Sequence, residues 1–278
     1  MIKTQEVNES FEELKQGVKD ILGFNSFQYK DSYLQRRFNT RLRAYNLDSY
    51  HDYWEILKRD KVEQERLLQD LTINVTEFFR DNPVYVVFQN EIVPNILRGK
   101  KGKIRIWSAG SSDGKEAYGI AMIMINALGE NIAQNKVEII GTDIDKECLE
   151  QANSGKYETR IGLVQTDIEK QMRFIEHPER YFDINSNMYT AKPYLKQMVK
   201  FEYHDLISGP KKKNFDIIFC RNVVIYFTRE LQEVLYKDFY DALNPGGYFV
   251  MGKTETLYGN ARELFVPYDL KERIYVKK

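Results

Sequence analysis

The chain has 278 residues, which suits one large domain or two smaller ones, and its hydrophobic fraction of 42% is enough to build a core. Its 41 lysines and arginines balance its 41 aspartates and glutamates, so the formal net charge is zero. This balance argues against a protein that coats nucleic acid or an anionic membrane, and we expect no nucleic-acid partner.

The cysteines, histidines and apolar segments indicate the compartment of the protein and whether it binds a metal or enters a membrane. Cys148 and Cys220 are too few for a disulfide framework, which is typical of a reducing compartment. The three histidines have no metal-ligand spacing to one another or to a cysteine, so we expect no bound metal. The N-terminus lacks an apolar signal-peptide core, and the longest nearly apolar stretch, from Ile120 to Leu128, is far below the ~20 residues of a membrane span. We therefore expect a cytoplasmic protein without direct membrane insertion.

The first 90 residues have the pattern of helices. Glycine is nearly absent after Gly23, and the alternation typical of strands is missing. Pro83 follows a break in the pattern and is suited to open a further helix. We predict an N-terminal helical domain over residues 1–90. Apolar residues recur at helical spacing in two runs, Tyr50, Tyr53, Trp54 and Leu57, then Leu67, Leu68 and Leu71.

Strand-type and helix-type segments alternate from residue 103 onward, which predicts a parallel sheet with helical crossovers. Residues 157–200 interrupt this alternation, and we expect them to form a short antiparallel insertion. The fold class expected for residues 91–278 is therefore α/β, a doubly wound sheet of roughly six strands. The expected strands lie in 103–110, 137–145, 199–206, 215–220, 248–252 and 273–278, and the expected helices in 115–128, 146–152 and 229–243.

Unusual residues follow several expected strands, at the edge where doubly wound sheets bind ligands. Gly110 and Gly114 are spaced G-x-x-x-G, which differs from the dinucleotide fingerprint but lets the backbone approach a ligand without a diphosphate. Asp143 ends the next strand, where an acid can accept hydrogen bonds from both hydroxyls of a ribose. Asp205 and Leu206 follow a third strand, where a carboxylate can accept the amino proton of adenine and a leucine can pack on its ring.

Each of these signals has a structural alternative. The glycine loop also suits an ordinary turn, and either aspartate also suits a helix N-cap, although Asp145 is better placed than Asp143 for capping. The polar run Cys220-Arg221-Asn222 would face the same crevice or form a solvated loop. Taken in order along the chain, the residues favour a nucleoside-type cofactor.

Four segments are distinctive enough to indicate a family. They are TINVTEFFRD (72–81), IWSAG (106–110), FCRNVVIYF (219–227) and PGGY (245–248). With them the chain resembles the CheR-type chemotaxis receptor methyltransferases over almost its whole length. The resemblance implies a helical N-terminal domain, a Rossmann-like class I methyltransferase domain and a small inserted antiparallel β-subdomain. It also implies S-adenosylmethionine as methyl donor, and glutamate side chains on the cytoplasmic helices of methyl-accepting chemotaxis receptors as acceptors. We expect a monomer.

The resemblance also assigns residues to the site. Arg80 and Tyr226 would face the methyl-transfer site. The alternatives are a surface ion pair for Arg80 and a buried core position for Tyr226. The residues expected to bind the cofactor are Asn74, Thr76, Arg80, Gly110, Glu116, Asp143, Asp205, Leu206, Asn222 and Val223.

The chain departs from the family in two loops. The family's first loop usually reads C-S-T-G-E-E-P-Y-S, whereas Asp113 here replaces the threonine and Lys115 replaces the first glutamate. Glu116 is retained. The family's G-H-S-E reads G-K-T-E at 252–255. The substitutions at Asp113 and Lys115 favour one alternative, a non-catalytic S-adenosylmethionine-binding adaptor of the same fold. A second alternative is a methyltransferase of the same fold for another acceptor.

The expected chemistry needs no general base, because a glutamate carboxylate is ionised at neutral pH and is a competent nucleophile. The enzyme must supply alignment and exclude water. Arg80 can hold a carboxylate through a planar pair of hydrogen bonds.

Basic residues gather in 30–43, where Asp31 is the only acid. On a helix, this segment would present a basic face that steers glutamate-rich receptor helices, or merely a solvated face. The residues expected to dock the substrate are Arg36, Arg37, Arg41 and Arg43.

Overall fold

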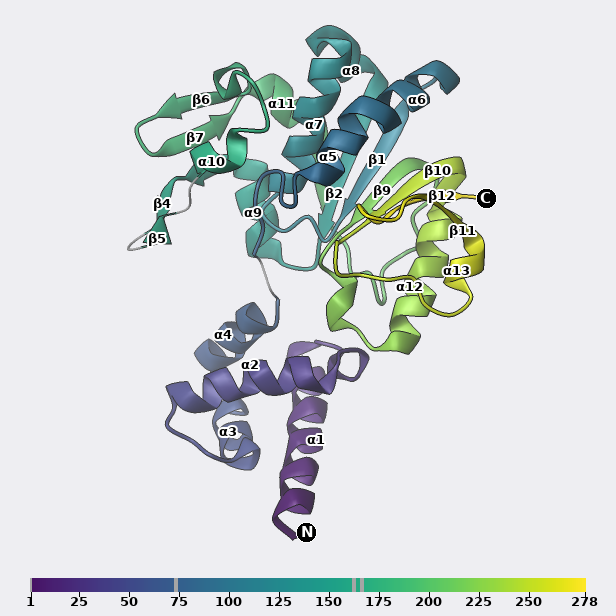
Figure 1. Ribbon diagram of the computed structural model, residues 1–278. Helices are drawn as coiled ribbons and strands as arrows, with labels where there is room; N and C mark the ends of the chain where they lie inside the picture. The colour runs from purple at the N-terminus through teal and green to yellow at the C-terminus, as the bar shows by residue number, and fades with distance from the viewer. Residues whose placement is uncertain (1, 73–74, 162–163, 166–167) are drawn as a thin grey trace. The chain divides into compact units, whose positions relative to one another are not determined.

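The computed structural model describes residues 2–72, 75–161, 164–165 and 168–278. The chain forms two compact units (Figure 1). The first contains residues 1–73 together with Tyr226–Leu231, and the second contains residues 74–225 and 232–278. None of the described helices is long and apolar enough to cross a membrane.

The first unit is helical, as the sequence predicts. Two helices begin at capping side chains: Ser49 accepts from the amide of Asp52, and Asp60 accepts from the amide of Val62. The aromatic and aliphatic side chains between the helices are buried. The elements are α1 (Ile2–Leu22), η1 (Ser26–Gln28), α2 (Asp31–Ala44), α3 (Tyr50–Leu57) and α4 (Lys61–Leu71).

A short segment from late in the chain, Tyr226–Leu231, completes the helical unit. Phe227 forms an antiparallel bridge with Tyr29. The amide of Lys30 donates to the carbonyl oxygen of Tyr226 at 2.9 Å. The helical unit is therefore built from two separate stretches of sequence.

The second unit is built on a seven-stranded sheet with the order β11-β12-β10-β9-β1-β2-β8. Five neighbouring strands, from β10 to β8, are parallel, and β12 and β11 add an antiparallel edge. The chain reverses its order between β1 and β9, so the carboxyl ends of these two strands flank a switch point where such sheets bind ligands. The strands are β1 (Ile104–Ala109), β2 (Val137–Asp143), β8 (Val199–Tyr203), β9 (Phe215–Cys220), β10 (Leu243–Met251), β11 (Phe265–Asp269) and β12 (Ile274–Lys277).

The seventh strand, β11, was not expected from the sequence. Pro267 lies within it, and a proline removes one donor from a strand. Because β11 is at the edge of the sheet, the missing donor is tolerated there.

Helices cover both faces of this sheet. Ile106 and Phe219 face the helices before and after β1, where Tyr85 and Ile123 join the same buried core. Trp107 points the other way and packs against Phe239 of α12. The helices are α5 (Pro83–Val87), the π-helical turn η2 (Phe88–Ile92), α6 (Val93–Gly99), α7 (Lys115–Leu128), α8 (Glu130–Lys136), α9 (Lys146–Ser154) and α12 (Arg229–Ala242).

The larger unit therefore begins well before the boundary near residue 90 expected from the sequence. Val84, Tyr85, Phe88 and Ile92 belong to the core cluster that contains the strands of the sheet. Their burial ties α5 and η2 to the larger unit, although their sequence reads as a continuation of the helical domain.

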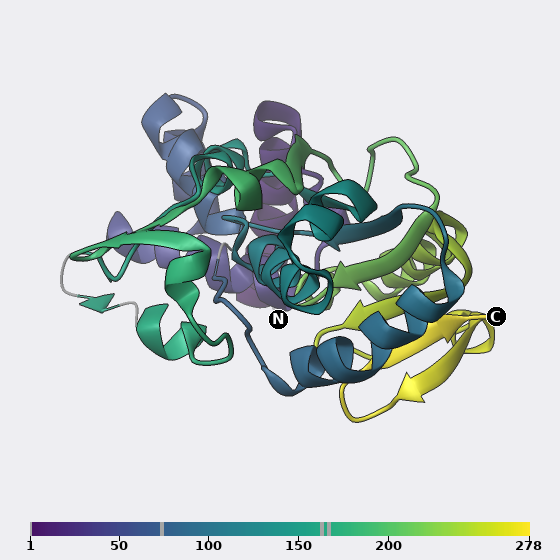
Figure 2. The same cartoon turned by 90° about the horizontal axis from the view of Figure 1, so that it is seen from above.

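The expected antiparallel insertion is present as a small sheet of order β3-β7-β6. In both views α7 lies between this sheet and the C-terminal strands (Figures 1 and 2). The remaining elements are β3 (Lys156–Glu158), β4 (Arg160–Ile161), β5 (Val164–Gln165), α10 (Ile168–Met172), η3 (Pro178–Arg180), β6 (Phe182–Asn185), β7 (Met188–Ala191), α11 (Pro193–Gln197), η4 (Val224–Tyr226) and α13 (Ala261–Leu264).

Candidate active site

The loops after β1 and β9 meet at the carboxyl edge of the sheet. Gly110 has a φ of +75°, and a Cβ built on it would lie 2.4 Å from Cγ2 of Val223. Only glycine fits here, because any side chain would meet Val223 and would strain the left-handed backbone. Two residues expected to bind the cofactor are thus brought together.

A buried carboxylate braces the first loop. Asp143, at the end of β2, is 9% exposed, and its Oδ2 accepts from the amide of Ser112 at 2.7 Å. Its Oδ1 accepts from the amide of Asp145 at 3.0 Å. Burial raises the pKa of Asp143, and these backbone donors oppose the rise. Asp145 itself caps α9 through the amide of Cys148, as the sequence suggested.

A second buried carboxylate braces the loop after β9. Glu255 is 2% exposed, and it accepts from the amide of Val223 at 3.1 Å and from the amide of Gly252 at 2.5 Å. Asn222, which precedes Val223, has a φ of +61°. Glu255 was not among the expected site residues; its signal was the glutamate retained in the 252–255 segment.

Glu116, in the first turn of α7, is the centre of a polar network. Its Oε1 accepts from Ser108 Oγ at 2.8 Å, and its Oε2 lies 3.5 Å from Tyr85 Oη and 3.7 Å from Arg221 Nη1. Arg221 also donates to Asp81 Oδ2 at 3.2 Å. Burial raises the pKa of Glu116, and the guanidinium opposes the rise. Sequence reasoning treated Arg221 only as part of a polar run and did not assign it to the site.

The segment that precedes α5 is anchored by two aromatic side chains. Phe78 packs edge-on against Tyr157, and Phe79 packs edge-on against Tyr85, and both phenylalanines are buried. Arg80 lies between Phe79 and Asp81, which both have positive φ angles, and its Nη1 donates to the carbonyl oxygen of Val75 at 3.1 Å. Two anchored neighbours therefore fix the backbone from which the Arg80 side chain extends.

Thr76 and Asn74 are the two other residues of this segment that were expected to bind the cofactor. Thr76 is half-buried. Asn74 lies outside the described residues.

The loop after β8 has a local role in the structure. Asp205 accepts from the amide of Ile207 at 2.9 Å and from the hydroxyl of Ser208, which closes a turn. His204 is buried and packs edge-on against Trp107. Leu206 is half-buried. Asp205 thus closes a turn, whereas the structural alternative expected from the sequence was a helix N-cap, and its contact with adenine stays a prediction.

Asp113 and Lys115, the two residues that differ from the family's usual loop, pair with each other. Lys115 Nζ forms an ion pair with the Asp113 carboxylate, and it lies 5.1 Å from the centre of the Tyr157 ring. The Tyr157 hydroxyl donates to the carbonyl oxygen of Asp113 at 2.7 Å. The two substituted side chains are therefore neutralised by each other within the loop.

Tyr226 belongs to the helical unit, where its ring packs 4.9 Å from that of Tyr33. The Arg37 guanidinium lies 5.6 Å from the centre of the same Tyr33 ring. Burial raises the pKa of Tyr33 to about 12, so its hydroxyl is neutral at physiological pH. Arg37 and Tyr226 therefore both lie against the Tyr33 ring within this unit, and the two tyrosine rings are tilted by 39°.

The four expected docking arginines of α2 differ in their surroundings. Arg36 and Arg43 are exposed. Arg41 instead binds Glu63 through two nitrogens, with Nε 2.8 Å from Oε1, and its Nη1 lies 3.3 Å from Asp70 Oδ2. Since Glu63 is fully buried, Arg41 is used to neutralise a carboxylate inside the unit.

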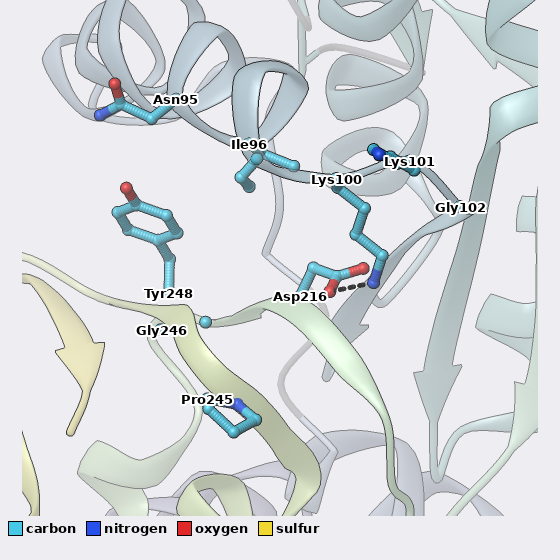
Figure 3. A pocket seen from close by; sticks show the side chains of 11 residues that line it. Asn95, Ile96, Lys100, Lys101, Gly102, Asp216, Pro245, Gly246 and Tyr248 are labelled. Atoms are coloured by element: carbon cyan, nitrogen blue, oxygen red, sulfur yellow. Dashed lines mark hydrogen bonds and ion pairs between the residues drawn. The ribbon is translucent and has the colours of Figure 1, made fainter.

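A separate cavity of about 460 Å³ lies at the opposite end of the strands, and none of the expected site residues lines it (Figure 3). Its Lys100 and Asp216 form an ion pair. Among the described residues, no group of three or more histidines, cysteines or acids has the arrangement of a metal site. Residues that line the cavity include Asn95, Ile96, Lys100, Asp216, Gly246 and Tyr248.

The carboxyl edge of the sheet fits a polar ligand. Ser111 Oγ and Arg221 Nε are buried side-chain atoms that have no hydrogen-bond partner among the described residues. They lie in the loops after β1 and β9, on either side of the switch point. Buried polar atoms are normally paired, so their position here is consistent with a ligand that completes their bonding.

Comparison with known proteins places the chain in a family. Residues 74–273 match the model of the CheR methyltransferase, SAM binding domain, and residues 9–72 match that of the CheR methyltransferase, all-alpha domain. A chemotaxis protein methyltransferase of Listeria innocua is 30% identical over 88% of this chain and 88% of its own length. One from Borreliella burgdorferi is 30% identical over 91% of both chains, and one from Salmonella typhimurium is 31% identical over 84% of this chain and 79% of its own length.

The resemblance expected from four short segments is thus confirmed over both units. The SAM-binding match covers the sheet whose carboxyl edge carries the braced loops, and the all-alpha match covers the helical unit. The chain belongs to the CheR methyltransferase family and is an S-adenosylmethionine-dependent methyltransferase.

Proposed function

We propose that this enzyme esterifies glutamate side chains on the cytoplasmic helices of chemotaxis receptors, with S-adenosylmethionine as methyl donor. The observation that carries the proposal is the link between Arg80 and the cofactor edge: Arg80 adjoins Asp81, and Asp81 is paired with Arg221 at the end of β9. Arg80, a cation that can bind a carboxylate, is thereby connected through Asp81 and Arg221 to the loops proposed to bind the donor. The names of the relatives support the chemotactic role.

The residues at the carboxyl edge suit the parts of the donor. Gly110, Asn222 and Val223 offer close backbone approach. The Asp143 carboxylate, which ends β2 at this edge of the sheet, suits the ribose hydroxyls. Glu116 is a largely buried acidic side chain at the start of α7, 13% exposed, and suits the ammonium group of the methionine part.

Three further residues complete the proposed donor site. Asp205 and Leu206 suit the adenine ring. Thr76, with Asn74 two residues earlier, suits the side of the donor that faces the segment before α5.

Methyl transfer to a carboxylate needs alignment more than proton transfer. When bound, S-adenosylmethionine supplies a methyl group activated by a sulfonium. The acceptor glutamate is already ionised at neutral pH, so no side chain of the enzyme has to remove a proton. Arg80 holds one face of the acceptor carboxylate through its planar fork and leaves an oxygen directed at the methyl group.

The helical unit supplies the acceptor side of the reaction. Tyr226 orients the acceptor through its phenol. Arg36, Arg37 and Arg43 steer the glutamate-rich receptor helix, whereas Arg41 keeps its internal partners. We further propose that the enzyme works as a monomer in the cytoplasm, where receptor methylation helices are accessible.

Transfer of a radiolabelled methyl group to receptor-containing membranes tests the proposal. We expect base-labile label, since esters hydrolyse in base, and we expect about a 100-fold loss with Arg80→Ala. Arg80→Lys should rescue little, because an ammonium keeps the charge but loses the planar fork. Donor affinity of each variant is measured separately by calorimetry.

Base-stable label on the receptor, or label only on a different acceptor, would contradict the ester assignment. Donor binding without transfer to any receptor would indicate an adaptor. Near-normal turnover in the lysine variant would show that charge alone aligns the acceptor.

A further inference from the structure

Arg221 joins three elements of the larger unit through one buried guanidinium. Its side chain is 3% exposed. Nη1 donates to Tyr85 Oη of α5 at 3.1 Å and lies 3.7 Å from Glu116 Oε2 of α7, and Nη2 lies 3.2 Å from Asp81 Oδ2. The guanidinium also lies 5.3 Å from the centre of the Tyr85 ring.

The charges of this network depend on one another. Glu116 is surrounded by Arg221, by Tyr85 and, further off, by the Cys220 thiol, so Arg221 is the one cation among these neighbours. Burial raises the pKa of Tyr85 and of Cys220, which keeps both groups neutral. Without the guanidinium, an ionised Glu116 would be a buried charge with only neutral donors, which is strongly unfavourable.

The network also connects the two halves of the proposed reaction. Glu116 lies at the start of α7, on the donor side, and Asp81 follows Arg80, on the acceptor side. A single side chain contacts both. Its position directly after β9, beside Asn222 and Val223, places it at the switch point of the sheet.

We propose that Arg221 is a positioning residue that orders both halves of the active site, by holding Glu116 for the donor's ammonium group and by holding Asp81, and with it the adjoining Arg80. The inference rests on the roles proposed above for Glu116 and Arg80. Its effect on the reacting atoms is exerted through these two carboxylates, while its Nε is available to the bound ligand.

Two ligands report the donor half without turnover. S-adenosylhomocysteine carries the amino-acid part, whereas 5′-methylthioadenosine has the same nucleoside thioether without it. Calorimetry with Arg221→Gln should show roughly a 10-fold to 100-fold loss of affinity for S-adenosylhomocysteine and almost none for methylthioadenosine. Arg221→Lys should recover part of the loss. The affinity of the glutamine variant for S-adenosylhomocysteine should also fall at a higher pH than that of the wild type, because Glu116 is then easier to protonate.

Matched variants separate positioning from general stability. Arg105→Gln removes another arginine of the same unit, which is paired with Glu138 at 2.8 Å, and should leave the affinity ratio of the two ligands unchanged. Asp81→Asn removes the charge that pairs with Arg221 on the acceptor side and leaves Glu116 unchanged. It should therefore lower the rate of receptor methylation while S-adenosylhomocysteine binds normally. Glu116→Gln should reproduce the selectivity loss of Arg221→Gln, and the double variant should lose little more. Glu116→Gln keeps the test valid if the Arg221 variants fail to fold.

The possible failures are distinguishable. If the wild type itself does not prefer S-adenosylhomocysteine over methylthioadenosine, the donor role of Glu116 is wrong, and the inference falls with it. If the wild type shows the preference and Arg221→Gln weakens both ligands equally, or neither, Arg221 is merely structural. Additive losses in the Arg221 and Glu116 double variant would lead to the same conclusion.

Discussion

Gly110 and Val223 are in direct contact across the switch point of the sheet, although they lie far apart in the sequence. The space at Gly110 is filled by the Val223 side chain, and Cγ2 would lie 2.4 Å from an added Cβ. Each loop is held by its own buried carboxylate, Asp143 on one side and Glu255 on the other. The shape of the cofactor edge therefore depends on two loops, each held by a buried carboxylate, that touch at Gly110.

Gly110→Ala should abolish donor binding, because the new methyl group must displace Val223 and the loop that carries it. Gly129→Ala is the matched control, since Gly129 has a similar φ of +77° but no atom within 4 Å of the new Cβ. Both variants should lose about 1–3 kcal/mol of unfolding free energy because a side chain strains a backbone of positive φ, and Gly129 also has a ψ of 154°, which only glycine readily adopts. Urea denaturation and calorimetry measure the two effects, and equal donor affinity in both variants would show that the contact does not shape the site.

Asp143→Ala should weaken donor binding by about 1.5–3 kcal/mol, the range for lost hydrogen bonds to a charged group. Asp145→Ala provides the comparison, because Asp145 caps α9 and should cost about 1 kcal/mol of stability without affecting the donor. Calorimetry with S-adenosylhomocysteine distinguishes them. Unchanged affinity in a folded Asp143 variant would remove this residue from the ribose site.

Donor affinity should fall in acid, starting at a pH above 4.5, the ordinary pKa of a glutamate, because burial raises the pKa of Glu116 and the bound ammonium needs the ionised form. Glu116 should affect the stability of the free protein in the opposite direction. A raised pKa in the folded state stabilises the fold below the ordinary pKa, and this contribution is lost as pH rises through the raised value. Comparing the wild type with Glu116→Gln by calorimetry and urea denaturation across this range isolates both effects. A wild-type affinity that follows the same pH curve as the variant would contradict the assignment.

Replacing Arg36 and Arg43 with glutamine should raise the Michaelis constant for receptor roughly 2-fold to 10-fold and flatten its salt dependence, because exposed charges act by screened steering. Turnover at saturating receptor should change little. Receptor kinetics and their salt response at wild-type values would show that this face is only solvated.

Arg41→Gln should behave differently from its exposed neighbours. It leaves Glu63 buried without its cation, which should cost about 3–5 kcal/mol of unfolding free energy. Thermal unfolding measures this loss, and a variant as stable as the wild type would show that Glu63 does not depend on Arg41.

The sheet could be predicted from the sequence because its strands are short apolar runs that alternate with helices of ordinary length. The helix expected at 115–128 and the strand expected at 215–220 are present with those bounds. β11 could not be predicted in the same way, since its Pro267 is acceptable only at an edge, and the edge is defined by tertiary pairing. Whether α5 and η2 belong to the helical unit or to the larger unit likewise depends on the surface against which they pack.

The position of a candidate site residue was predictable where it depends on the end of a strand, as for Asp143, whose contact with the donor stays a prediction. It was not predictable where a residue acts through distant partners. Arg221 reads as one polar residue among three, and its importance appears only when Asp81 and Glu116 are brought to it. The difference between Arg41 and Arg36 is of the same kind, because spacing on a helix does not reveal which arginine meets a buried glutamate.

The bridge between Tyr29 and Phe227 has a consequence for how the chain is made. During synthesis the helices of residues 2–72 leave the ribosome long before Tyr226–Leu231 exists, so the backbone bond from Lys30 to Tyr226 and the ring contacts of Tyr29 and Tyr33 with this segment are still missing. A protein cut after residue 72 would remain in that state permanently. The contacts between the N-terminal helices and Tyr226–Leu231 therefore form only once most of the methyltransferase sequence has been translated.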